Sequence, residues 1–287
     1  MQQDKRANKF FGLQKDNGGL VIMYEGFKLE LDVGYDAQFF GEHCKQIGKR
    51  HLSEQKHIIS QNLKHYIING IDLIDGSVIE EEWFPQIEAD IFISHSHKDI
   101  DLVHMLAGWI NSKFGLKCFV DSNVWAFCDD LAELLNSEYS NKRRSLDNDG
   151  YLYDYISCQD VSKHVNTMLT LSLYKMIDRT ETLFFLNTPN SIAPYANDEQ
   201  ESSKSPWIYS ELMCSEIVRR QLPRRRGFIL EHSDGYSYAS EGANIIYKVP
   251  TKHLLPLDIE TLQDWENAVQ QDDDKHPLDI LYSIVNI

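Results

Sequence analysis

The chain has 287 residues, of which 42% are hydrophobic and 11% aromatic, enough to build the core of one large domain or two modest ones. Its formal net charge of −16 repels phosphate backbones, so we expect no direct binding of nucleic acid. It has no apolar run long enough to cross a membrane, no N-terminal secretory pattern and no Cys-x-x-Cys pair among five scattered cysteines, so we expect a cytoplasmic protein without a disulfide framework.

Residues 1–86 predict a small N-terminal α+β unit. The alternation of apolar and polar residues over Phe27–Val33 predicts a strand, paired with Leu20–Tyr24 across a turn at Glu25-Gly26. Apolar residues at helical spacing predict a helix over Leu52–Asn69, and a second hairpin is expected around Asp75-Gly76. The unit contains no motif that indicates chemistry, so its role stays unassigned.

A short apolar run, Ile91–Ile93, leads directly into Ser94, His95 and Ser96. This pattern predicts a buried strand followed by a polar loop. Ligands of open α/β sheets bind in the crevice outside the carboxyl ends of the strands, so these three polar residues are candidates for a binding site.

A helix and a second strand are expected after this loop. Ser96 and Asp99 have the spacing of a capping box, with Asp in place of the usual Glu or Gln. The helix that follows is expected to direct Leu102 to Phe114 inward at helical spacing and to end at Gly115. Lys117–Val120 predicts the second strand.

A long polar stretch, about 122–160, separates the second strand from the next helix and is expected to be an insertion with a short helix over Leu131–Leu135. Val161–Ile177 predicts the third helix of this part, and Thr182–Leu186 predicts the third strand.

Ser205 followed by Pro206 is the preferred order at the start of a helix. Gly227–Leu230 and Ile245–Val249 are then expected to be the last two strands. The alternation of strand and helix predicts an α/β domain over residues 87–287, with a flavodoxin-like, five-stranded parallel sheet covered by helices on both faces.

Three segments together resemble a known family. Asp90–Ser96 resembles the first strand and loop of Toll/interleukin-1 receptor (TIR) domains, and Cys118–Asp121 is similar to their second strand, which often ends in an acidic residue. Trp207 and Glu211 resemble the tryptophan and the glutamate, four residues apart, of the NAD-cleaving members. The insertion at 122–160 and the N-terminal unit depart from the family pattern.

The resemblance implies an NAD+ nucleosidase of the bacterial defence type, acting as a glycohydrolase or an ADP-ribosyl cyclase, with NAD+ as substrate and no cofactor. Positive charge develops on the ribose as nicotinamide leaves, and a carboxylate beneath the ring stabilises that charge. By this resemblance Glu211 is the catalytic residue. The expected substrate-binding residues are Phe92, Ser94, His95, Ser96, Ser205 and Trp207.

Each of these residues also has a purely structural interpretation. Glu211 would then only solvate a helix, since charged helix residues usually lie on the surface. Trp207 and Phe92 would only pack in a core, as buried aromatic residues mostly do. Ser94 would only end a strand, and Ser96 would only cap a helix.

Other reactive side chains are weaker candidates. Glu216 points away from Glu211 around an ideal helix, and Cys214 is expected to face the sheet as a small apolar residue. His95 and His97 fit no familiar set of metal ligands, so no metal site is expected. The arginines of Arg219–Arg226 are interpreted as the cationic end of a helix rather than as an anion site.

The resemblance further implies antiphage immune signalling, a homo-oligomer formed through the TIR domain, and an upstream sensor or a downstream effector as partner. Hydrolysis to ADP-ribose and cyclisation remain open. The main alternative is a non-catalytic TIR scaffold that acts through TIR–TIR association. A nucleoside deoxyribosyltransferase, which shares the sheet type and uses a glutamate, is a third possibility.

Overall fold

The computed structural model describes twelve parts of the chain. These are residues 25–31, 34, 36–54, 73–120, 122–141, 143–144, 151–194, 201–218, 220, 223, 246–272 and 274–285.

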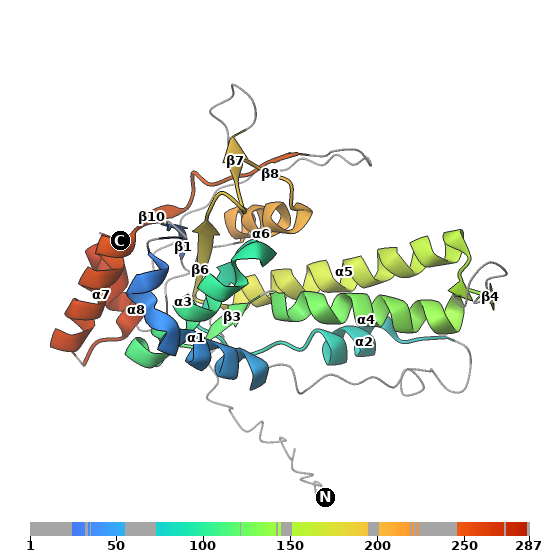
Figure 1. Ribbon diagram of the computed structural model, residues 1–287, viewed down its shortest axis with the longest axis horizontal. Coiled ribbons are helices and arrows are strands. Elements are labelled where there is room, and N and C mark those ends of the chain that lie inside the picture. Colours follow the sequence, from blue (N-terminus) through green and yellow to red (C-terminus); the bar gives the residue numbers. More distant parts are fainter. Residues whose placement is uncertain are drawn as a thin grey trace, which may run out of the picture.

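A five-stranded sheet in which all strands are parallel forms the centre of the molecule (Figure 1). Its strands, in spatial order, are β10 (Leu255–Leu257), β1 (Glu25–Glu30), β6 (Thr182–Asn187), β2 (Ile91–Ser94) and β3 (Cys118–Val120). This arrangement confirms the predicted α/β fold class. The two strands expected at Ile91–Ile93 and Thr182–Leu186 lie side by side in the middle of the sheet.

The N-terminal strand does not belong to a hairpin. Glu25 and Gly26, expected to form a turn, are the first two residues of β1 and pair with β6 in parallel register. β1 also pairs in parallel with β10, so it is an internal strand of the main sheet. The proposed partner Leu20–Tyr24 lies outside the described residues. Because an N-terminal strand completes the main sheet, a boundary near residue 86 does not separate two units within the described residues.

Apolar and polar residues alternate in β1 because its two faces have different neighbours inside the fold. The expected cause, a hairpin with one face exposed to water, does not apply. Phe27 and Leu29 are buried on one face of the sheet, and Lys28 points to the other. The Lys28 ammonium is 2.5 Å from Glu201 and 3.2 Å from Glu30, so its charge is compensated inside the fold. A polar position in an alternating strand therefore does not require contact with bulk water.

Among the described residues, two helices lie between β1 and β2. α1 (Ala37–Glu54) is interrupted at Gly41, which has a φ of 76°, and packs along α3 (Ile100–Phe114). Residues 55–69 of the expected helix Leu52–Asn69 lie outside the described part of the chain. The second expected hairpin is wrong, because α2 (Gly76–Trp83) occupies its place. The Asp75 carboxylate accepts hydrogen bonds from the amides of Ser77 (3.0 Å) and Val78 (3.3 Å) and so begins a helix instead of a turn.

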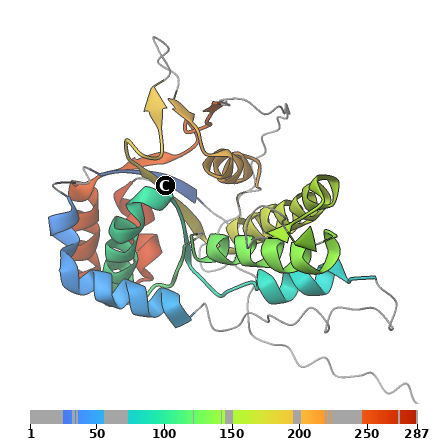
Figure 2. The same cartoon turned by 45° about the vertical axis from the view of Figure 1, so that its right-hand side comes forward.

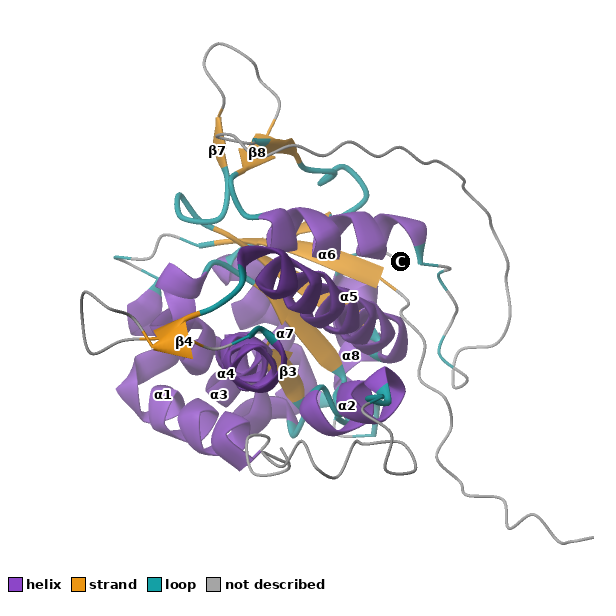
Figure 3. Ribbon diagram, turned by 90° about the vertical axis from the view of Figure 1, so that its right-hand side faces the viewer, coloured by secondary structure: helices purple, strands orange, loops and turns teal. Residues whose placement is uncertain are grey.

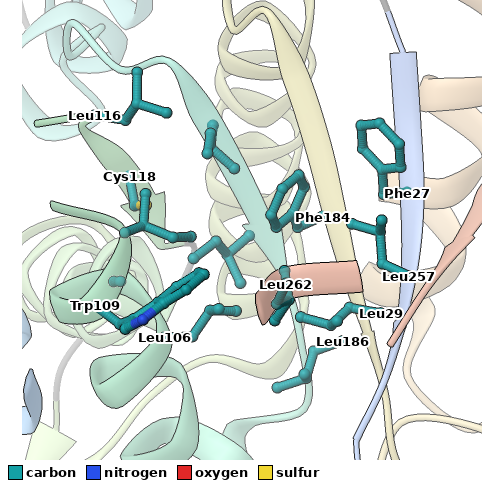
Figure 4. Packing of buried hydrophobic residues seen from close by; sticks show 14 of the residues in the cluster. Phe27, Leu29, Leu106, Trp109, Leu116, Cys118, Phe184, Leu186, Leu257 and Leu262 are labelled. Atoms are coloured by element: carbon teal, nitrogen blue, oxygen red, sulfur yellow. The ribbon is translucent and has the colours of Figure 1, made fainter. Parts of the chain in front are cut away.

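Helices cover both faces of the sheet (Figure 2). One face carries α1, α3, α7 (Ile259–Gln271) and α8 (Pro277–Ile284), whose apolar side chains meet those of the strands in the core shown in Figure 4. The opposite face carries α2, α4 (Ser122–Tyr139), α5 (Tyr155–Arg179) and α6 (Pro206–Ile217). Successive strand residues alternate between the two cores, as Ile91 and Phe92 do.

α3 matches its prediction closely. All the side chains expected to point inward are buried except that of Phe114, which is half-buried, and Gly115 ends the helix in the left-handed conformation with a φ of 68°. The Ser96 side chain accepts from the Lys98 amide at 3.4 Å and begins the short 3₁₀ turn η3 (His97–Asp99) that precedes the helix.

The insertion is largely helical. α4 and α5 lie side by side as an arm that extends from the sheet, joined by a small hairpin of β4 (Arg143–Arg144) and β5 (Tyr151–Leu152) (Figure 1). The expected short helix is only the middle of α4, and α5 begins earlier than expected because Asp154 caps it at Tyr155. Among the described residues, large exposed apolar side chains gather at the arm's far end. They are Tyr139, Tyr151, Leu152, Tyr155 and Ile156.

Of the last two strands expected from the sequence, only the one at Ile245–Val249 falls partly within the described residues, and it belongs to a different sheet. Tyr247–Lys248 forms β9 of a small antiparallel sheet with β7 (Ala193–Pro194) and β8 (Glu201–Ser203), and Gly227–Leu230 lies outside the described residues. β10 at Leu255–Leu257 ends the parallel sheet instead. Within the described ranges, no helix combines the length and the apolar character that crossing a bilayer requires.

Candidate active site

The candidate site lies where the strand order of the main sheet reverses direction. After β2 the chain passes to β3 on one side, and it then returns across β2 to β6 on the other side. The carboxyl ends of β2 and β6 therefore border the crevice in which open α/β sheets bind ligands. Ser94 is the last residue of β2, and Asn187 is the last residue of β6.

Glu211 reaches this edge from α6. Its side chain is fully buried, with 0% relative exposure, and Ser94 Oγ donates a hydrogen bond to Glu211 Oε2 at 2.7 Å. The two residues are 117 positions apart in the chain. The structure thus brings together the catalytic candidate and one of the expected substrate-binding residues.

Local signals at the start of α6 set the position of Glu211. Ser205 Oγ accepts from the Ile208 amide at 3.3 Å, and Pro206 occupies the first turn, as expected from the sequence. Among the buried positions that follow, Ile208, Glu211 and Ser215 are spaced by three and four residues. Glu211 therefore belongs to the stripe of α6 that faces the strands, where an apolar residue would be usual. Figure 3 shows α6 beside α5 over the strands.

The burial of Glu211 has an energetic consequence. Removing an ionised carboxylate from water costs several kcal/mol before compensation, and glutamate is among the residues least often fully buried. A donor such as the Ser94 hydroxyl offsets part of that cost by hydrogen bonding to the charged form. A carboxylate held in this way at the carboxyl end of a central strand is a candidate for function rather than for packing.

The aromatic candidates have different environments. Phe92 is fully buried on the same core as α6, and its ring centroid lies 5.3 Å from that of Phe119. This position corresponds to the packing interpretation of Phe92. Trp207 is only half-buried at the edge of that core, one turn before Glu211 on α6. Of the two rings, only that of Trp207 is partly exposed to solvent.

The other two candidates of the loop after β2, His95 and Ser96, lie at the start of this loop. His95 is buried, and its Nδ1 lies 3.3 Å from the Ile93 carbonyl oxygen. Its ring centroid is 6.4 Å from that of His97. Ser96 is half-buried and caps η3. Among the described residues, no group of three His, Cys, Asp or Glu side chains could hold a metal ion.

Asp99 has a role that the capping-box interpretation missed. Its carboxylate is buried and accepts hydrogen bonds from Thr188 Oγ1 and Asn190 Nδ2, both at 2.6 Å. It therefore joins the loop after β2 to the loop after β6 instead of turning back to Ser96. The polar residues that directly follow Leu186 were the available signal, because the ends of neighbouring parallel strands meet at one edge of the sheet.

The remaining reactive groups of α6 are now placed. Burial, with a smaller contribution from the carboxylates of Asp178 and Glu211, raises the pKa of the Cys214 thiol to about 12. Cys214 is thus a buried thiol rather than a nucleophile, as expected. Glu216 is exposed on the far side of the helix. Arg220 forms an ion pair of 2.6 Å with the buried Glu25.

Comparisons with known proteins add no relative. No protein-family model, no curated protein and no solved structure shows significant similarity to this chain. Arguments about its function therefore depend on the geometry of its own residues.

Proposed function

We propose that this protein cleaves the bond between nicotinamide and ribose in NAD+, with Glu211 as the catalytic carboxylate. The observation that supports the proposal best is the buried carboxyl of Glu211, held by Ser94 at 2.7 Å where β2 ends. The half-buried Trp207 one turn earlier supplies an aromatic surface beside it. The resemblance of both segments to NAD-cleaving TIR domains gives the substrate.

The chemistry needs one well-placed negative charge. Nicotinamide leaves as a neutral molecule, taking the bonding electrons, and positive charge develops on the ribose. Glu211 stabilises that charge electrostatically, most strongly where water is excluded. Ser94 orients the carboxylate through Oε2, and Trp207 provides a flat wall for the nicotinamide ring. Attack by water yields ADP-ribose and a proton, whereas attack by an adenine nitrogen yields a cyclic isomer.

Substrate access requires movement. Because Glu211 has 0% relative exposure, a ribose reaches its carboxyl only after neighbouring groups shift. The loops that follow β2 and β6 begin at the sheet edge where the Glu211 carboxyl lies. They are therefore the segments that we expect to move when substrate enters. Closing over bound substrate would exclude water and thereby favour cyclisation over hydrolysis.

The direct test uses purified full-length protein and NAD+. Nicotinamide release is measured for the wild type, for Glu211→Gln and for the matched control Glu216→Gln, an exposed glutamate of the same helix. Losing the charge of Glu211 is expected to raise the barrier by about 3–5 kcal/mol, or roughly 10²- to 10⁴-fold in rate. The control should keep the wild-type rate. Mass spectrometry of the products distinguishes ADP-ribose from a cyclic isomer.

Two results would decide against the proposal. Equal turnover by the wild type and Glu211→Gln would remove Glu211 from the mechanism. No release by the wild type at any protein concentration would favour the non-catalytic TIR scaffold, in which Glu211 is structural.

We extend the proposal to antiphage defence by a homo-oligomer that consumes cellular NAD+, as the TIR resemblance implies. If neighbouring subunits complete the site, specific activity rises with protein concentration. A flat dependence across the concentration range would contradict that part.

A further inference from the structure

A chain of buried polar groups starts at Asp99. Thr188 Oγ1 and Asn190 Nδ2 each donate to the Asp99 carboxylate at 2.6 Å, and Thr188 Oγ1 also accepts from the Asn190 amide at 3.1 Å. Asp99 and Thr188 are both buried. Hydrogen bonds to an ionised acceptor in a low-dielectric interior are stronger than those between neutral groups. The loop that follows β6 is therefore firmly attached to the loop that follows β2.

The chain of hydrogen bonds continues from Thr188 to the start of α6. The Thr188 amide donates to Ser191 Oγ at 2.9 Å, and the Ser191 carbonyl accepts from Ser203 Oγ at 2.8 Å. Ser203 Oγ in turn accepts from the Ser205 amide at 3.1 Å. Ser205 is the N-cap of α6. We call Thr188, Ser191, Ser203 and Ser205 the hydroxyl relay. Each of its bonds joins the hydroxyl of one residue to a backbone group of another.

The relay closes a ring. Asp99 lies five residues after Ser94, the relay connects Asp99 to the first turn of α6, and Glu211 of α6 returns to Ser94 through the 2.7 Å hydrogen bond. The ring joins β2, β6, β8 and α6. Ser191 and Ser203 are also buried, so water does not compete freely for these bonds.

We propose that Asp99 and the hydroxyl relay are positioning residues that hold α6 in register with β2, so that Glu211 and Trp207 stay aligned with Ser94. The inference rests on the proposed function only for its catalytic consequence. Its structural part, the coupling of Asp99 to the first turn of α6, stands or falls independently of any reaction.

The variants remove one hydroxyl at a time. Thr188→Val keeps the shape of the side chain and removes the donor to Asp99, whereas Thr188→Ser keeps the donor. Thr167→Val is the matched control, because Thr167 donates its hydroxyl to the Lys163 carbonyl on an exposed part of α5. Ser203→Ala interrupts the relay at its other end and serves where Thr188→Val does not fold.

Two measurements are made on the full-length chain. Amide hydrogen exchange over residues 205–212 reports the stability of the first turns of α6, and steady-state kinetics with NAD+ report the alignment of the site. In Thr188→Val and Ser203→Ala, exchange should accelerate and kcat should fall about 10- to 100-fold, because small misplacements cost that much. KM should change by less than about twofold. Thr188→Ser and Thr167→Val should resemble the wild type in both measurements.

The outcomes separate the two proposals. Unchanged exchange over residues 205–212 in both Thr188→Val and Ser203→Ala overturns the inference, whatever the activity. Accelerated exchange with unchanged kcat overturns the positioning role. A wild type that releases no nicotinamide overturns the proposed function, and the exchange data then still decide whether the relay holds α6.

Discussion

Glu211 is hard to explain by packing alone. Its carboxyl lies fully buried on the stripe of α6 that faces the strands, where an apolar side chain of similar volume would avoid the desolvation cost. Gln at this position still accepts a hydrogen bond from Ser94 without carrying a charge. We therefore expect Glu211→Gln to melt at a temperature no lower than the wild type, as replacement of a residue kept for activity often does.

His253 is a half-buried titratable group with a clear consequence for stability. Its Nε2 lies 2.8 Å from Ser215 Oγ. Burial, and then the nearby charge of Arg220, lower the pKa of His253 to about 4. The folded protein therefore favours the neutral form of the His253 imidazole.

Stability should fall on acidification because of His253. An unfolded histidine takes up its proton near a pKa of about 6.5, whereas the folded one does so near 4. Its contribution is thus complete above pH 6.5 and is lost as the pH falls from 6.5 towards 4. Urea unfolding across this range should show a shallower decline for His253→Gln than for the wild type. Parallel curves would contradict the assignment.

The His253→Gln variant is needed as a reference because the titration of Glu25 changes the stability with pH in the opposite direction. Burial raises the pKa of Glu25, although Arg220 and the Gly26 amide partly counteract it. A raised carboxyl pKa makes the folded state bind protons more readily, so this group favours folding as the pH falls. The difference between the wild type and His253→Gln isolates the histidine.

The helix pair α1 and α3 depends on two glycines. A Cβ at Gly48 would overlap the carbonyl oxygen of His104, and a Cβ at Gly108 would overlap that of Cys44. The two backbones therefore approach more closely than any side chain at these positions allows. This contact attaches the N-terminal helix to the helix that follows β2.

We expect Gly108→Ala to destabilise the protein although alanine favours helices. Relieving the overlap requires the helices to separate, at a cost of about 1–3 kcal/mol or more, which exceeds the gain of up to about 1 kcal/mol in helix propensity. Gly76→Ala is the control, because nothing lies within 4 Å of a Cβ at that position. Denaturant unfolding should show a loss for the first variant and none for the second. Equal stabilities would show that α1 and α3 can separate freely.

Short motifs were ambiguous at other elements. Asp75-Gly76 is a common hairpin turn, but the same aspartate caps a helix when the amides that follow it turn inward. Ser205-Pro206 had one consistent interpretation and was correct. The difference is that a serine before proline matches a helix start at two positions at once.

The position of β1 makes the N-terminal segment part of the main fold. β1 pairs with β6 on one side and with β10 on the other. Without it, β6 would expose unpaired backbone groups, and β10 would have no neighbour in the described sheet.

A chain that begins at residue 87 is therefore expected not to fold. It lacks β1 and also α1, which covers α3. Circular dichroism and thermal unfolding should show no cooperative transition for this fragment, in contrast to the full-length protein. A fragment with a cooperative transition and native-like near-ultraviolet signal would restore the boundary expected near residue 86.

Much of the candidate site could be predicted from local patterns. Ile91–Ile93 and Thr182–Leu186 were identified as strands because continuous apolar runs bounded by polar residues are typical of buried parallel strands. The helical phase after Ser205 placed Trp207 and Glu211 one turn apart. The rule for strand ends marked Ser94 as a candidate, but Glu211 was assigned to the same site through the resemblance to TIR domains and not through a local pattern.

The neighbours of each strand were not predictable in the same way. The alternation in β1 shows which side chains face each core, but backbone hydrogen bonds are the same for every residue and name no partner strand. Likewise, Asp99 accepts hydrogen bonds from Thr188 and Asn190 only because β2 and β6 are neighbours in the sheet. Local sequence therefore specified several of the central strands and helices and the faces that they bury. The packing of segments far apart in the chain decided which elements lie together, because burial of apolar surface is summed over the complete fold.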